Sequence, residues 1–196
     1  MSETIEFFYD YISPATYIAF KRLPELVERH GVSIEYKPVL LGGIHKAVEH
    51  KAAITQHPSK LQWMYRDLQR TAKRHDIPFG HNPNFPFLTV GVMRGALVAK
   101  ERGEIDAFNR AFFDAMWRDG KKLDDMQVIG EVLASVGLDV EAYAQGAQDP
   151  RIKELLKTET SAAVERAVFG CPTFIVRGEV VFGQDRIHVV EEILGE

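Results

Sequence analysis

Two short segments, far apart in the chain, carry residue types that can do chemistry. The first is Ser13-Pro14. Serine is a preferred helix N-cap and proline a preferred first helical residue, so a helix should begin here. The unpaired N–H groups and the macrodipole of a helix start favour an anion, so Ser13 could hold a thiolate or a carboxylate. The plainer interpretation, that Ser13 only caps its helix, is the more frequent one for such a pair.

The second segment is Gly170-Cys171-Pro172-Thr173, in which a proline directly precedes an apolar run. A cis Cys171-Pro172 bond, a state found in about 5–6% of X–Pro bonds, would turn the C=O and N–H of Cys171 out of the sheet. These groups could then pair with an extended ligand. A trans proline at a strand start is the alternative, since that position tolerates proline.

Cys171 is the single cysteine of the chain. It excludes a disulfide within the chain and a Cys-x-x-Cys redox pair. Any thiol chemistry must therefore use an outside thiol, or Cys171 alone. A cysteine beside a strand is more often a small packed residue than a nucleophile.

The elements that position these segments follow from hydrophobic periodicity. Alternation predicts strands over residues 4–9 and 33–37, and helical spacing with a His30-Gly31 stop predicts a helix between them. Near the end of the chain, two apolar runs around Arg177-Gly178 predict a hairpin. Asp185 is a plausible N-cap for a last helix. The two ends thus supply a βαβ and a ββα unit, and ligands collect where the strands of such a sheet end.

The middle of the chain shows helical periods without a convincing strand. Four apolar stripes predict helices over residues 61–72, 105–116, 129–136 and 152–167, and a Pro-rich loop over 77–86 precedes a helix near Thr89. The aromatic side chains of this region are most simply helix core, with some available to wall an aromatic substrate pocket: Phe108, Phe112, Phe113 and Trp117. We therefore expect an α/β fold in which residues 1–40 and 169–196 form one discontinuous domain and 41–168 an inserted all-α domain.

Composition excludes several classes of function. The chain has 196 residues with 24 basic and 28 acidic side chains, a formal charge of −4, and no long block of one sign. Nucleic acid and membrane surfaces are therefore not indicated as partners. The N-terminal segment lacks the features of a signal peptide, so a cytoplasmic protein is expected. The seven histidines form no metal-binding motif, and we expect no metal.

Three segments resemble the signatures of 2-hydroxychromene-2-carboxylate isomerases and the related kappa-class glutathione transferases. This group has a thioredoxin-like fold with an inserted helical domain, and the resemblance covers essentially the whole chain. The segments are Phe8-Tyr9-Asp10-Tyr11-Ile12-Ser13-Pro14, Phe169-Gly170-Cys171-Pro172-Thr173-Phe174 and Phe182-Gly183-Gln184-Asp185-Arg186.

The resemblance implies a glutathione site. Ser13 matches the family's catalytic serine, whose hydroxyl donates a hydrogen bond to the glutathione sulfur and lowers the thiol pKa from about 8.5. Thr16 matches the second cysteine of the related disulfide oxidoreductases, so their redox chemistry is absent. The resemblance places the cysteine unit of glutathione against Cys171, before cis-Pro172. Gln184 and Asp185 match the residues that bind the γ-glutamyl end.

The resemblance identifies fewer residues for the glycine carboxylate of glutathione and for the carboxylate of the substrate. In the kappa class, an Asn near the position of His50 and a Lys matching Lys60 face the glycine carboxylate. This chain retains the lysine, whereas His50 differs from the Asn. Lys46 and Lys51 lie nearby and could serve a carboxylate, although a solvated basic surface is the commoner explanation. Arg94, with Lys46 and Lys51, is a candidate for the substrate carboxylate. In the segment that borders the substrate pocket of this family, Leu88 replaces a common Asn.

The resemblance implies a glutathione-dependent cis–trans isomerase that acts on a small aromatic carboxylate of the 2-hydroxychromene-2-carboxylate type. The thiolate would add reversibly to the conjugated substrate, with glutathione as cofactor. A kappa-like transferase that forms a stable conjugate is the nearest alternative. A thioredoxin-like scaffold that binds peptides without catalysis is a third. The resemblance also implies a homodimer.

Overall fold

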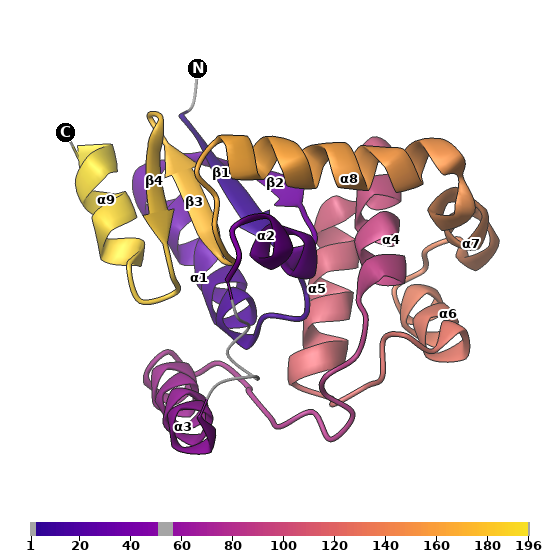
Figure 1. Ribbon diagram of the computed structural model, residues 1–196, viewed down its shortest axis with the longest axis horizontal. Coiled ribbons are helices and arrows are strands. Elements are labelled where there is room, and N and C mark those ends of the chain that lie inside the picture. Colours follow the sequence, from indigo (N-terminus) through magenta and orange to yellow (C-terminus); the bar gives the residue numbers. More distant parts are fainter. Residues whose placement is uncertain (1–2, 51–56, 196) are drawn as a thin grey trace.

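The computed structural model describes residues 3–50 and 57–195, and its elements follow the expected order of βαβ, helices, and ββα (Figure 1). The four-stranded sheet has the order β2-β1-β3-β4. Strand β1 pairs in parallel with β2, whereas the β1–β3 and β3–β4 pairs are antiparallel. The strands are β1 (Thr4–Tyr9), β2 (Ser33–Pro38), β3 (Thr173–Val176) and β4 (Glu179–Phe182). All four strands predicted from the sequence are confirmed.

Helix α1 (Pro14–His30) begins and ends where its sequence signals predict. The Ser13 side chain accepts a hydrogen bond from the Thr16 N–H, and Pro14 occupies the first turn. At the other end, Gly31 adopts the left-handed conformation at φ 65°, which glycine tolerates without a Cβ clash, and its N–H bonds back to Val27. The predicted N-cap at Ser13 is therefore confirmed.

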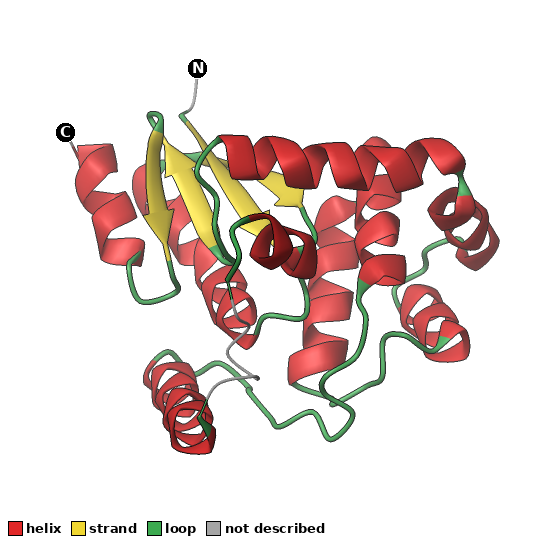
Figure 2. Ribbon diagram, viewed as in Figure 1, coloured by secondary structure: helices red, strands yellow, loops and turns green. Residues whose placement is uncertain are grey.

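Helices fill the chain between β2 and β3 in the described residues (Figure 2). The bounds are α2 (Leu41–Ala47), α3 (Pro58–Arg74), α4 (Val90–Glu101), α5 (Ile105–Trp117), α6 (Met126–Ser135), α7 (Val140–Gln148) and α8 (Pro150–Glu165). The four predicted stripes and the helix after Thr89 are confirmed. Helices α2 and α7 were not predicted, because their short sequences carry too few apolar positions to reveal a period. None of the described helices is long and apolar enough to span a membrane.

Two details of the predicted elements are wrong. The stripe that reached Ala167 ends earlier, since α8 stops at Glu165 and Ala167 has a left-handed φ of 62°. The last helix, α9 (Ile187–Gly195), begins at Ile187, so Asp185 lies one residue before the N-cap position. The carboxylate of Asp185 is therefore not engaged as that cap.

The sheet is covered on both faces, and successive side chains at the end of β1 pack into two different clusters. Ile5, Phe7 and Tyr9 belong to the large core cluster that also contains α1 and α9 side chains. Phe8 points to the opposite face and packs in a smaller cluster with α2 and α8 residues such as Ile44. Strand order and helix packing together bring the β1–α1 turn, α2 and the ends of β3 and β4 to the same region (Figure 1).

The large core cluster also joins the sheet to the helices between β2 and β3. The ring of Phe113 on α5 lies 5.7 Å from Tyr9, 4.6 Å from Tyr11 and 4.6 Å from Phe20, measured between centroids. Aromatic pairs at such distances contribute packing beyond their buried area. The boundaries proposed for an inserted domain, after residue 40 and before residue 169, remain a proposal.

Candidate active site

A large cavity opens beside the start of α1. Its volume is about 1780 Å³, and it is bounded by the β1–α1 turn, α2, α3, the loop before α4, and the ends of β3 and β4. This exceeds the range of about 300–1,000 Å³ that is usual for small-ligand sites. Of the residues predicted for the site, Ser13, His50, Cys171, Pro172, Gln184 and Asp185 all line it.

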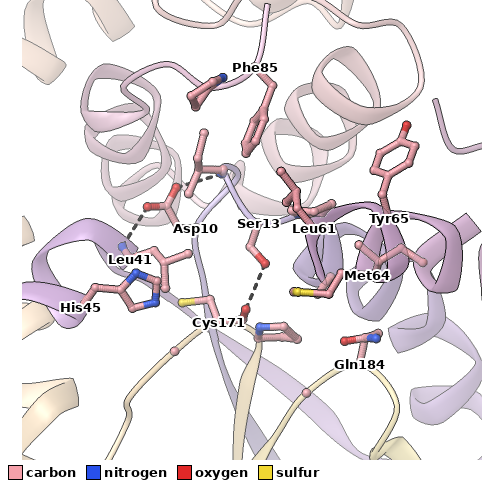
Figure 3. Close-up of a pocket in the computed structure, with 18 of the residues that line it drawn as sticks. Asp10, Ser13, Leu41, His45, Leu61, Met64, Tyr65, Phe85, Cys171 and Gln184 are labelled. Carbon is pink, nitrogen blue, oxygen red and sulfur yellow. Dashed lines mark hydrogen bonds between the residues drawn. The ribbon is translucent and has the colours of Figure 1, made fainter. Parts of the chain in front are cut away.

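Ser13 lies at the centre of this arrangement, and its hydroxyl has two partners. Its Oγ accepts from the Thr16 N–H at 3.2 Å and donates to the carbonyl oxygen of Cys171 at 2.9 Å (Figure 3). The Cys171–Pro172 peptide bond is cis, the alternative that makes a ligand contact possible. Two segments 158 residues apart in sequence thus meet at one hydrogen bond inside the cavity.

The Cys171 thiol is buried beside this bond. Burial raises its pKa well above the usual value, and the charge of Asp10 raises it further. The thiol is therefore neutral at physiological pH, and a neutral thiol is a poor nucleophile. The structure supports the packed role for this cysteine.

Asp10 is a site residue that the sequence analysis did not single out. Its carboxylate is buried and accepts three hydrogen bonds: from the Thr89 hydroxyl at 2.7 Å, the Leu41 N–H at 2.9 Å and the Ile12 N–H at 3.1 Å. Burial nevertheless raises its pKa, since desolvation outweighs these bonds. The sequence signal that could have identified Asp10 is an acidic residue at the end of a strand, three positions before a helix N-cap.

The segment with Gln184 and Asp185 is attached to the cis-proline loop. The Gly183 N–H donates to the Pro172 carbonyl at 3.0 Å, and Gly183 has a φ of 105°, which favours glycine. The guanidinium of Arg22 on α1 donates to the backbone oxygen of Gln184 at 3.0 Å. The Asp185 carboxylate stays 60% exposed at the cavity and pairs with Arg186.

The predicted cationic residues are distributed differently. Lys46 and Lys60 are exposed and do not line the cavity, and neither does the half-buried Arg94 on α4. Lys51 lies outside the described residues. The cavity lining instead contains His45 beside His50 on the α2 side.

Apolar side chains form much of the cavity rim. Six large hydrophobic residues that line it are substantially exposed: Val48, Leu61, Trp63, Leu88, Phe169 and Phe182. The rings of Phe169 and Phe182 lie 4.8 Å apart, which fixes the two loops that carry Cys171 and Gln184 against each other. Trp117 also lines the cavity, whereas Phe108, Phe112 and Phe113 are buried core residues. The expectation that aromatic helix residues are mainly core, with some at the pocket, is confirmed.

The chain is similar to known proteins over nearly its whole length. Residues 4–195 match the model of the DSBA-like thioredoxin domain. A 2-hydroxychromene-2-carboxylate isomerase of Sphingobium xenophagum is 28% identical, over 99% of both chains. The glutathione S-transferase kappa 1 of Caenorhabditis elegans is 30% identical, over 97% of this chain and 90% of the relative.

A solved structure of a 2-hydroxychromene-2-carboxylate isomerase superposes with a TM-score of 0.89 at 27% identity, and covers 98% of this chain and 94% of that one. The predicted thioredoxin-like fold with helices between its two halves is confirmed. The chain belongs to the DSBA-like thioredoxin domain family, among relatives named 2-hydroxychromene-2-carboxylate isomerase and kappa glutathione S-transferase.

Proposed function

We propose that this protein is a glutathione-dependent cis–trans isomerase of the 2-hydroxychromene-2-carboxylate type. One observation carries the proposal: the Ser13 hydroxyl, at the start of α1, meets the backbone carbonyl of Cys171 before the cis-proline. That juxtaposition lies in a cavity large enough for a tripeptide and a second small molecule. The names of its relatives support an isomerase or a transferase.

The residues present fit glutathione. The carbonyl of Cys171 is an acceptor for a backbone N–H of an extended ligand, and Asp185 offers an exposed carboxylate to an ammonium group. Gln184 directly precedes Asp185 in the chain and also lines the cavity. These three residues would bind the tripeptide, while the start of α1 would stabilise a negative charge on its sulfur.

Ser13 has one hydroxyl proton and two possible acceptors. In the structure this proton is directed to the Cys171 carbonyl. An anion at the helix start would compete with that carbonyl for the proton, because a charged acceptor forms the stronger hydrogen bond. The carbonyl could meanwhile accept an N–H of the ligand. Ser13 would then donate to a thiolate while its oxygen still accepts from the Thr16 N–H.

Bound glutathione would supply a thiolate that adds reversibly to a conjugated double bond, so that the bond can rotate before the thiolate leaves. The chain contributes orientation and stabilisation of the anion. Its single cysteine supplies no dithiol for disulfide exchange. The small aromatic carboxylate substrate and the homodimer belong to the same proposal and rest on the family resemblance. The cytoplasmic location is proposed with them.

A kappa-like glutathione transferase is the second candidate, favoured by the relative of that name in Caenorhabditis elegans. The thiolate would be stabilised in the same way in both activities, and only the fate of the adduct would differ. Assays of the purified protein with glutathione, against 2-hydroxychromene-2-carboxylate and a halogenated nitroaromatic, distinguish them. Isomerisation without consumption of glutathione supports the first candidate, and stoichiometric conjugation the second.

Replacing the central hydroxyl tests both candidates. Ser13→Ala should raise the pKa of bound glutathione by about one to two units, because it removes a charge-assisted hydrogen bond. Turnover at neutral pH should fall by roughly tenfold to a hundredfold. The thiolate can be followed by its ultraviolet absorbance as the pH is raised.

Two further variants separate chemistry from folding. Ser13→Thr retains a hydroxyl and should keep part of the effect on the thiol pKa. Ser135→Ala removes a hydroxyl from α6, where it bonds the Val132 carbonyl, and should leave the thiol pKa unchanged. Failure of glutathione to bind the wild-type protein would refute the proposed function.

A further inference from the structure

His45 and His50 form a pair at the end of α2. Their ring centroids are 4.8 Å apart, and the backbone N–H of His50 donates to the backbone carbonyl of His45 at 2.9 Å. Both side chains line the cavity, and Figure 3 shows the His45 ring directed into the space that Ser13 and Cys171 also border. The pair therefore occupies one wall of the proposed active site.

The pair matters because the cavity has few other cationic groups. Among the described residues that line it, the remaining basic side chains are Arg66 on α3 and His81 on the loop before α4. Lys46 and Lys60 lie outside the lining. Within the described part of the chain, a carboxylate that enters beside α2 thus encounters the imidazoles of His45 and His50.

The surroundings of His45 disfavour its charged form. Partial burial lowers the pKa of His45, and the charge of His50 lowers it further. The neighbouring α8 contributes Thr160, Ala163 and Val164 to its contact with α2, none of which is charged. On the sheet side, Asp10 bonds to the N–H of Leu41 and the Cys171 thiol is neutral.

Other charged groups complete the surroundings. Lys46 and Glu49 are exposed on the same segment, and across the cavity the lining includes the acidic residues Asp67 and Asp185. In the ligand-free state, burial and the neighbouring His50 thus disfavour a charge on His45. A bound carboxylate would reverse this preference, because it stabilises an imidazolium by a charge-assisted hydrogen bond.

We propose that His45 and His50 together form a carboxylate subsite that takes up a proton when it binds its ligand. The inference rests on the proposed glutathione chemistry, since the carboxylate belongs either to the glycine of glutathione or to the aromatic substrate. Both sources share the same chemistry, so the experiment must separate them.

Proton uptake is measured by titration calorimetry in buffers of different ionisation enthalpy. S-methylglutathione is the probe for the first source, because its blocked sulfur has no proton to release. 2-Hydroxychromene-2-carboxylate is the probe for the second. Near neutral pH one of them should bind with uptake of up to about one proton, and its affinity should rise by up to about tenfold for each pH unit of acidification.

The glutamine variants provide the decisive comparison. His45→Gln and His50→Gln keep a polar side chain that cannot be protonated in this pH range. Each should abolish the uptake and weaken binding of that ligand by roughly tenfold below pH 7. His188→Gln removes an exposed histidine of α9 outside the cavity and serves as the matched control.

The ligand source follows from a probe with a blocked carboxylate. S-methylglutathione whose glycine carboxylate is converted to the amide has no acid at that position, so it should bind without uptake if the subsite holds the glycine carboxylate. If uptake accompanies only the aromatic carboxylate, the subsite belongs to the substrate. Either result supports the subsite and identifies its occupant.

Equal proton counts in the wild type and in both glutamine variants, for both ligands, would overturn the subsite. Glutathione binding and Ser13-dependent thiolate formation would survive that result, so the proposed function would stand. If neither glutathione nor S-methylglutathione binds at all, the proposed function fails as well. Imidazole chemical shifts of His45, followed by NMR with and without ligand, provide a readout independent of activity.

Discussion

At the scale of single residues, Asp10 shows how the site uses a buried charge. Its carboxylate joins three pieces of the cavity wall: the β1–α1 turn through Ile12, the start of α2 through Leu41, and the segment before α4 through Thr89. Because burial outweighs these bonds, the folded protein holds the proton of Asp10 more tightly than the unfolded chain does. We infer that positioning of the site is maintained against an electrostatic cost.

That cost has a defined pH dependence. The pKa of Asp10 is raised in the folded state, so its contribution to stability falls as the pH rises from about 3.9, the unfolded value, through the raised folded value. Asp10→Asn removes this dependence. Urea unfolding across the acid range should therefore show the wild type losing stability relative to the variant as the pH rises. Parallel stability curves for the two proteins would contradict the assignment.

At the scale of elements, α1 positions the far side of the site as well as Ser13. Arg22 lies two turns after the helix start and donates to the backbone oxygen of Gln184. Half-burial lowers the pKa of its guanidinium, and its Nε has no hydrogen-bond partner among the residues that the structure describes. The bond to the Gln184 carbonyl thus connects the segment before α9 with α1, and we assign Arg22 as a positioning residue.

Arg22→Met should loosen that connection while it preserves most of the apolar stem. The Kd for glutathione should rise by roughly fivefold to tenfold, because the carbonyl loses its donor, whereas kcat at saturating glutathione should change little. Arg22→Lys should restore part of the affinity.

Arg29→Met is the matched control for this change. Arg29 lies on the same helix and pairs with Glu191 at the surface, away from the cavity. Its Kd for glutathione should equal that of the wild type. A fall in kcat with unchanged affinity in Arg22→Met would contradict the positioning role.

At the scale of the whole molecule, the cavity depends on how the sheet and the helices share one core. Phe113 is fully buried and contacts aromatic rings from β1, the β1–α1 turn and α1: Tyr9, Tyr11, Tyr17 and Phe20. The sheet and the inserted helices are therefore expected to unfold together, although the chain visits them in separate segments.

Phe113→Ala should lower the free energy of unfolding by about 3–5 kcal/mol, because it leaves a cavity at this junction. Unfolding should remain a single transition when it is followed by both circular dichroism and tryptophan fluorescence. Phe169→Ala, at a ring that is 48% exposed, should cost less than about 1 kcal/mol. Two separate transitions in the wild type would show that the sheet and the helices are independent units.

Local patterns in the sequence were sufficient for much of the fold. Alternation identified β1 and β2, since the side chains of a strand reach the same face every second residue. Two apolar runs around the Arg177-Gly178 turn identified β3 and β4. Helix signals placed Ser13 at the start of α1. The short helices α2 and α7 were not predicted, because packing against α8 and α4 stabilises them and their own sequences carry too few apolar positions to show a helical period.

Part of the candidate site likewise follows from the sequence, and the rest depends on the tertiary structure. The sequence alone determined that one cysteine allows no dithiol chemistry, and that a serine caps a helix directly after a strand. Only the tertiary structure decided that Cys171–Pro172 is cis, that Asp10 bonds to Leu41 and Thr89, and that His45 rather than Lys46 faces the cavity. The physical reason is that capping and periodicity act over a few residues, whereas burial and cavity geometry depend on contacts between segments distant in the chain.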